Sequence, residues 1–274
     1  MAAPSLHSAS LTPGVRIEAL ASARLASDVR NRILVAVSGG PDSTALLIVL
    51  HEAGHHVVAA HYDHALQPGS ERAADHVRDL CRRMGVELIL ERRESMMPRG
   101  SVQAGARTLR YEFLERARAQ TGADVVAIAH TADDVVEGVV LHLLRGCGLA
   151  GMRGMPARRG VFVRPLLAVW RSDIIEFLEL RGIEPLQDPA NSNEAYARVR
   201  VRRDILPALE RDRPGIVKRF HRAAACAGDR AAQRHNNSFG QCLTRQTPRP
   251  PPNACLTDIF RRRTAEREEA RLAA

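Results

Sequence analysis

A short loop of small and polar residues, Ser38-Gly39-Gly40-Pro41-Asp42-Ser43, carries the clearest chemical signal in the sequence. It stands between apolar runs at residues 33–37 and 44–50, which predicts a turn from a strand into a helix. Glycines let a backbone approach an anion closely, and the free N–H groups at a helix start bind phosphate oxygens. The Asp42 carboxylate would repel a bare phosphate, so it suits an Mg²⁺ ion that a phosphate carries. An ordinary tight turn is the alternative interpretation.

Polar residues also follow the second apolar run, at residues 56–60. His61, Asp63 and His64 come directly after it. Three groups so close on one turn rarely satisfy the geometry of a single metal ion. We interpret them as the polar lining of a nucleotide pocket, with purely structural hydrogen bonding as an almost equal alternative.

A pair of carboxylates, Asp133 and Asp134, follows the fourth apolar run. Thr131 is placed to cap the helix predicted from residue 132, and acidic residues suit the positive N-terminus of that helix. The pair also comes after a strand, on the side where the phosphate loop is expected. Capping alone explains the pair, whereas a site for an ammonium group or a second Mg²⁺ is the functional alternative.

Arginines form two further groups. Arg107 and Arg110 share one helical stripe, for which a solvated basic surface is the ordinary interpretation. A denser cluster suits RNA phosphates or charge that develops on an adenylate, with a basic helix surface as an equal alternative. The members of this cluster are Arg198, Arg200, Arg202 and Arg203.

The elements that position these residues follow from the hydrophobic pattern. Strands are predicted at 33–37, 56–60, 86–90, 125–129 and 161–163. Helices are predicted at 43–53, 70–84, 102–119, 132–145, 171–181, 201–210 and 216–234. This alternation predicts an α/β fold that is doubly wound around a mainly parallel five-stranded sheet, with a basic helical C-terminal appendage. Ligands bind past the carboxyl ends of such strands, which is where the loop and the aspartates are expected.

The charge is unevenly distributed along the chain. Lys and Arg total 40 against 31 Asp and Glu, a net charge of +9, and 18 of the basic but only 9 of the acidic residues follow position 192. A neutral body with a basic C-terminal third indicates a polyanionic partner such as nucleic acid. The predicted organisation is an N-terminal, partly helical extension at 1–30, a catalytic domain at 31–190, a basic helical segment at 191–234 and a disordered tail at 235–274.

The five cysteines are odd in number and include no Cys-x-x-Cys pair, which argues against a disulfide framework, a zinc site or an iron–sulfur site. No apolar run reaches the roughly 18 residues needed to cross a bilayer. No secretory signal is visible at the N-terminus. We therefore expect a cytoplasmic protein that does not associate with membranes.

The loop from Ser38 to Ser43 resembles the phosphate loop of the N-type ATP pyrophosphatases, and it lacks the Gly-Lys-Ser/Thr of a Walker loop. The other motifs, in their order and spacing, resemble the tRNA(Ile)-lysidine synthetases over about residues 30–210. These motifs are His61-Tyr-Asp-His-Ala-Leu66, Gly105-Ala-Arg-Thr-Leu-Arg-Tyr111, Ala129-His-Thr-Ala-Asp-Asp134, Arg164-Pro-Leu-Leu167, Asp188-Pro-Ala-Asn191 and Tyr196-Ala-Arg-Val-Arg-Val-Arg202.

The resemblance implies an adenine nucleotide alpha hydrolase-like fold that uses ATP and Mg²⁺. It implies ligation of free lysine to C2 of the wobble cytidine of tRNA(Ile), through an adenylated tRNA and with release of AMP and pyrophosphate. It assigns ATP to the loop and His61, with Asp42 on the metal. It assigns catalysis or lysine binding to Asp42, Asp133, Asp134 and Arg107, and tRNA binding to Arg110, Arg198, Arg200 and Arg202. The oligomeric state stays open, a homodimer included.

Four positions depart from the family pattern: Val135 and Gly138 replace polar residues, Val199 replaces an amide and Ala190 replaces a serine. These departures favour, as one alternative, a catalytically impaired tRNA-binding paralogue. A tRNA thiolase of the same superfamily is a second alternative, but the cysteine spacing that it needs is missing. A small-molecule amidating ligase is a third, which leaves the basic third of the chain unexplained.

Overall fold

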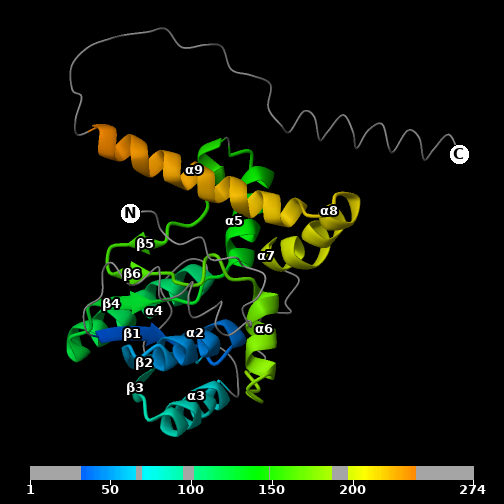
Figure 1. Cartoon of the computed structure of the whole chain (residues 1–274). Helices are drawn as coiled ribbons and strands as arrows, with labels where there is room; N and C mark the ends of the chain where they lie inside the picture. Colours follow the sequence, from blue (N-terminus) through cyan, green and yellow to red (C-terminus); the bar gives the residue numbers. More distant parts are fainter. Residues whose placement is uncertain (1–31, 66–69, 95–101, 148, 187–196, 239–274) are drawn as a thin grey trace, which may run out of the picture. The chain divides into compact units, whose positions relative to one another are not determined.

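The computed structural model describes residues 32–65, 70–94, 102–147, 149–186 and 197–238 (Figure 1). The predicted extension at 1–30 and almost all of the predicted tail lie outside these residues. The chain divides into two compact units, one made of residues up to Val135 together with Pro156–Val199, and one made of Val136–Met155 and the residues from Arg200 onwards. The domain boundaries predicted at residues 190 and 234 stay predictions.

The first unit is built on a sheet whose described strands follow the order β3-β2-β1-β4-β6-β5. The strands are β1 (Arg32–Ala36), β2 (His56–Asp63), β3 (Glu87–Arg92), β4 (Val125–Ala127), β5 (Arg158–Arg159) and β6 (Phe162–Val163). All neighbours pair in parallel except β5 and β6, which pair antiparallel. The predicted doubly wound, mainly parallel sheet is confirmed. It has one more strand than the five expected, because the two exposed arginines of β5 give no hydrophobic signal.

Both faces of this sheet are covered, which explains why its strands are apolar on both sides. Helices α2 (Pro41–Glu52), α3 (Glu71–Met84) and α6 (Arg171–Glu179) pack on the face that Ile33 and Val35 present. Helix α4 (Val102–Thr121) packs through Phe113 on the other face, where Leu34 points. Alternate residues of β1 are therefore fully buried in two different cores.

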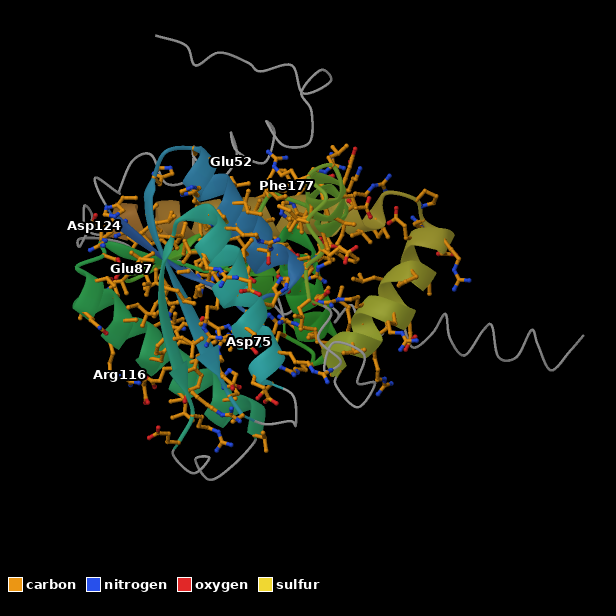
Figure 2. All side chains as sticks on the ribbon, turned by 90° about the horizontal axis from the view of Figure 1, so that it is seen from below. Glu52, Asp75, Glu87, Arg116, Asp124 and Phe177 are labelled. Atoms are coloured by element: carbon orange, nitrogen blue, oxygen red, sulfur yellow. The ribbon has the colours of Figure 1, made fainter. Side chains whose placement is uncertain are left out.

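Charged residues tie the strands together at their amino ends, away from the loop. The Arg32 guanidinium donates to Glu87 at 2.8 Å, and the Arg32 backbone N–H donates to Asp124 at 3.3 Å. Figure 2 labels the two acceptors, Glu87 and Asp124. These contacts link β1 to β3 and to the segment before β4. The candidate functional residues lie at the opposite, carboxyl ends of the strands.

The second unit is helical in its described part. Besides most of helix α5 (Ala132–Leu144), it contains η1 (Leu149–Arg153), a π-helical turn η3 (Val201–Ile205), α8 (Leu206–Asp212) and α9 (Ile216–Ser238). Short helix α7 (Ala197–Arg200) leads into η3. The π turn was not predicted. Its cause is Pro207, which has no N–H to donate to the Arg203 carbonyl and whose ring crowds that oxygen.

A glycine at the middle of α5 offers a stability prediction. A Cβ at Gly138 would meet no heavy atom within 4 Å, and glycine in a helix interior costs about 0.5–1 kcal/mol relative to alanine. Gly138→Ala is therefore expected to raise the free energy of unfolding by about that amount, measured by urea unfolding followed by circular dichroism.

The matched control is Gly146→Ala, where a Cβ also meets open space but φ is +76°. Because an L side chain is strained there, this control is expected to lower the free energy of unfolding. A loss of stability in Gly138→Ala would contradict the prediction.

Candidate functional site

The loop from Ser38 to Ser43 makes the predicted turn from β1 into α2. Gly39 has a φ of +87°, and a Cβ there would lie 3.5 Å from the Val77 side chain. The Ser43 hydroxyl accepts a hydrogen bond from the Ser38 N–H and donates one to the Gly40 carbonyl, both at 3.1 Å. The two serines therefore hold the loop closed, while the N–H groups of the first turn of α2 have no partner within the helix. This arrangement can receive phosphate oxygens.

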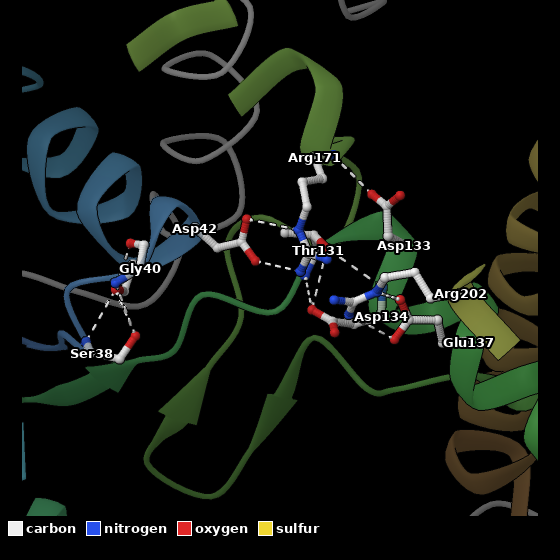
Figure 3. A network of polar contacts seen from close by, with 10 residues as sticks. Ser38, Gly40, Asp42, Thr131, Asp133, Asp134, Glu137, Arg171 and Arg202 are labelled. Atoms are coloured by element: carbon white, nitrogen blue, oxygen red, sulfur yellow. Dashed lines mark hydrogen bonds and ion pairs between the residues drawn. The ribbon is translucent and has the colours of Figure 1, made fainter. Parts of the chain in front are cut away.

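Asp42, in the first turn of α2, is bound by a residue that sequence reasoning missed. The Arg171 guanidinium donates to both carboxylate oxygens, at 2.6 and 3.3 Å, and Asp42 is 17% exposed (Figure 3). Burial nevertheless raises the pKa of Asp42 above its usual value, and the charges of Asp134 and Asp133 raise it further. Asp42 and the aspartate pair are therefore close enough to interact. Arg171 lies 129 residues further along the chain, so no local pattern signals this pair.

The aspartate pair caps two different helices. Asp134 accepts hydrogen bonds from the backbone N–H and the hydroxyl of Thr131, at 2.9 and 3.2 Å, which confirms the capping interpretation for the start of α5. Asp133 instead accepts the Arg171 N–H at 2.8 Å and so caps α6. The three first turns of α2, α5 and α6 are joined through these contacts, and carboxylates gather at their positive ends.

The strand predicted at 56–60 extends to Asp63, so His61 and Asp63 lie at the carboxyl end of β2, where they have two different roles. His61 is 4% exposed, and its Nδ1 lies 2.8 Å from the Val37 carbonyl beside the loop. Burial lowers the pKa of His61, so its ring is neutral and donates through Nδ1. Its buried Nε2 is then an acceptor with no partner among the described residues. Asp63 has a structural role, because it accepts the Ala65 N–H at 2.9 Å and lies 3.6 Å from Arg92.

The two arginines of α4 differ in their surroundings. Arg107 is exposed, donates to the Tyr111 hydroxyl at 3.1 Å and stacks over that ring with its Cζ 4.9 Å from the centroid. Arg110 is partly buried with its Cζ 5.9 Å from the same centroid. Burial and the neighbouring charge of Arg107 lower the pKa of Arg110. No ion pair to either arginine occurs in the described ranges.

The predicted cluster at 198–203 is helical, but its members are used differently. Arg198 and Arg200 are exposed. Arg202 instead binds Glu137, another residue that the sequence analysis missed, with N–O distances of 2.6 and 3.2 Å (Figure 3). The Glu137 side chain is only 1% exposed, so this ion pair holds the second unit together. A lone glutamate in the apolar stretch of α5 was the available signal.

A model of the PP-loop domain family matches residues 15–209, a stretch that includes the loop, the aspartate pair and the arginine cluster. The chain belongs to the PP-loop domain family. Membership implies ATP binding, in agreement with the loop geometry at the start of α2. No site residue of this PP-loop chain is tested by the match, so the individual assignments stay proposals.

Two curated relatives of this PP-loop chain are named tRNA(Ile)-lysidine synthase. The one from Bacteroides thetaiotaomicron is 38% identical over 191 residues, covering 68% of this chain and 45% of the relative. The one from Thermobifida fusca is 39% identical over 204 residues, covering 73% of this chain and 63% of the relative. The chain thus spans about half the length of the curated relatives it matches.

A solved structure shares the fold. The U34-tRNA thiolase NcsA from Methanococcus maripaludis, solved with its [4Fe-4S] cluster, superimposes with a TM-score of 0.67 at 16% identity, covering 86% of this PP-loop chain and 85% of the thiolase. Among the described residues of this chain, no three His, Cys, Asp or Glu side chains gather as metal ligands. Cys81 is buried, and burial raises the pKa of its thiol to about 11. None of the helices in the described part is both long and apolar enough to span a membrane.

Proposed function

We propose that this chain ligates lysine to C2 of the wobble cytidine of tRNA(Ile), with ATP as the energy source. The observation that carries the proposal is the meeting of Asp42 and the pair Asp133 and Asp134 at the end of a phosphate-binding loop. Similarity to two proteins named tRNA(Ile)-lysidine synthase supports it. In this reaction the C2 oxygen attacks the α-phosphorus, pyrophosphate leaves, and the lysine ε-amine then displaces AMP.

The loop is proposed to bind the departing pyrophosphate through the N–H groups of the first turn of α2. His61 is proposed to accept a hydrogen bond from the nucleotide at its unpartnered Nε2. Mg²⁺ that is bound to phosphates needs only one or two protein carboxylates. Asp42 fits that need, because its largely buried carboxylate is stabilised by a cation. In this structure the cation is the Arg171 guanidinium. When bound, the ion would neutralise charge on the phosphates.

The aspartate pair is proposed to hold the ammonium groups of lysine. Each carboxylate already accepts a backbone N–H hydrogen bond, which fixes its orientation. A fixed carboxylate can accept charge-assisted hydrogen bonds from an ammonium group in a defined position. Arg107, exposed on α4, is proposed to take part in catalysis or lysine binding. Neither role needs a protein nucleophile, because the amine of lysine attacks the adenylated base directly.

The RNA partner is proposed to be tRNA(Ile), bound by Arg110, Arg198, Arg200 and Arg202 in the cytoplasm. The wobble base lies in an unpaired loop, so it can be splayed into a pocket without melting a helix. Arg198 and Arg200 are exposed and suited to phosphates. Arg202 is engaged by Glu137, so we propose that it positions its neighbours.

The deciding experiment is the incorporation of labelled lysine into a tRNA(Ile) transcript by the purified chain. Incorporation is expected only with ATP and only when the wobble base is cytidine, and a transcript with uridine there is the matched control. Pyrophosphate release with a sulfur donor, but none with lysine, would replace the proposal with the thiolase alternative.

A catalytically impaired paralogue is the second candidate, favoured by the buried apolar side chains of Val135 and Val199 where the family pattern has polar ones. Such a protein would bind the transcript without consuming ATP. The same experiment therefore separates the two candidates.

A further inference from the structure

Three side chains at the carboxyl ends of parallel strands carry buried polar atoms that have no hydrogen-bond partner among the described residues. They are the Nδ1 of His64 after β2, the Nδ1 of His130 after β4 and the Nε of Arg164 after β6. Arg164 is only 4% exposed, and its Nη1 donates to the Pro156 carbonyl at 2.7 Å. Within the described part of the chain, no carboxylate pairs with the Arg164 guanidinium.

His130 and Arg164 follow the ends of β4 and β6, which pair in parallel, and the Tyr111 ring on α4 lies with its centroid 4.8 Å from that of Phe162 on β6. The pKa of His130 falls to about 4, first because of burial and then because of the charges of Arg164, Arg110 and Arg107, with Asp134 acting in the opposite direction. Burial and the charge of Arg110 likewise lower the pKa of His64 to about 4. The charges of three guanidinium groups therefore act on the His130 ring, and both imidazoles are neutral at physiological pH.

A buried guanidinium without a counter-charge is costly, so this arrangement calls for an anion. Guanidinium forks match the geometry of phosphate oxygens, and a neutral imidazole can donate one further hydrogen bond. Asp134 accepts the N–H of Thr131, the residue after His130, and its charge also acts on Asp42, so the group borders the loop site.

We propose that Arg164, Arg110 and His130 form a second phosphate site beside the loop from Ser38 to Ser43. This inference rests on the proposed function, because the phosphate would belong either to the ATP or to the RNA strand whose base enters the pocket. The site lies in the first unit, between the ends of β4 and β6 and helix α4.

The test measures the binding of ATP and of an anticodon stem-loop RNA separately, without lysine. Arg164→Gln keeps a donor for the Pro156 carbonyl and removes the charge, and Arg110→Gln removes a partly buried charge that makes no described ion pair. The matched control is Arg116→Gln, also on α4 but at the surface, where Arg116 pairs with Glu91 at 2.7 Å. Arg116 is labelled in Figure 2.

Both variants are expected to weaken the same ligand at least tenfold, and the control to weaken neither. Weakening of ATP alone assigns the phosphate to the nucleotide. Weakening of RNA, with a logarithmic salt slope smaller by about 1, assigns it to the RNA backbone. Unchanged binding of both ligands by Arg110→Gln, with an unchanged urea unfolding midpoint, would overturn the site.

This test is independent of lysine ligation. If the unmodified chain fails to incorporate lysine but its ATP or RNA binding depends on Arg110 and Arg164, the phosphate site stands and the proposed ligase activity does not. If lysine is incorporated and neither variant changes binding, the ligase stands and the site does not.

Discussion

Asp42→Asn is expected to lower lysine incorporation by about 10²–10³-fold, the range for removing one preorganised electrostatic group from an active site. The same change is expected to alter the free energy of unfolding by no more than about 1 kcal/mol, a typical value for a neutral isostere. The reason is that burial already raises the pKa of Asp42, so the native state gains little from its charge. Initial rates and urea unfolding, measured on one preparation, separate the two effects.

Asp75→Asn is the control for this change. Asp75 lies on α3, pairs with Arg78 at the surface and is labelled in Figure 2. It is expected to leave both the rate and the stability unchanged. An Asp42→Asn protein that keeps more than a tenth of the rate would show that the carboxylate is not part of the reaction.

Arg202→Met is expected to destabilise the second unit by up to about 3–5 kcal/mol, because it removes a guanidinium that binds the buried Glu137 carboxylate. Urea unfolding followed by circular dichroism measures the loss. Arg200→Met removes an exposed arginine two positions away, and is expected to change stability by less than about 0.5 kcal/mol.

The double variant Glu137→Met with Arg202→Met is expected to recover at least half of that loss, since a buried ion pair is often replaced by apolar groups at little cost. RNA binding gives a second readout. If Arg202 only positions its neighbours, the double variant binds RNA more tightly than Arg202→Met alone. A stable Arg202→Met protein with weakened RNA binding would instead make Arg202 a direct phosphate contact.

The sequence predicts the sheet well because each main strand is a short apolar run, and burial on both faces leaves no ambiguity about the face that is covered. The loop from Ser38 to Ser43 and the Thr131 cap were predictable because their partners lie within a few residues. Arg171 was not, because its partner Asp42 is brought close only by the packing of α6 on α2.

Other features escape sequence reasoning for different reasons. The π turn depends on how one helix accommodates Pro207, which propensity does not register. In the sequence, Arg202 is indistinguishable from the exposed arginines beside it, and nothing there indicates that it pairs with Glu137. Buried charge is invisible until the chain is folded.

The contacts that join the first turns of α2, α5 and α6 have a consequence for selectivity. Three positive helix ends and a phosphate loop would, by themselves, attract any small oxyanion. The carboxylates of Asp42, Asp133 and Asp134 cancel much of that attraction. Under the proposed function, free inorganic phosphate would be repelled by these carboxylates, whereas a polyphosphate that arrives with its own divalent cation would satisfy the amides and the carboxylates together. The acidic first turns would then select the metal complex of the nucleotide.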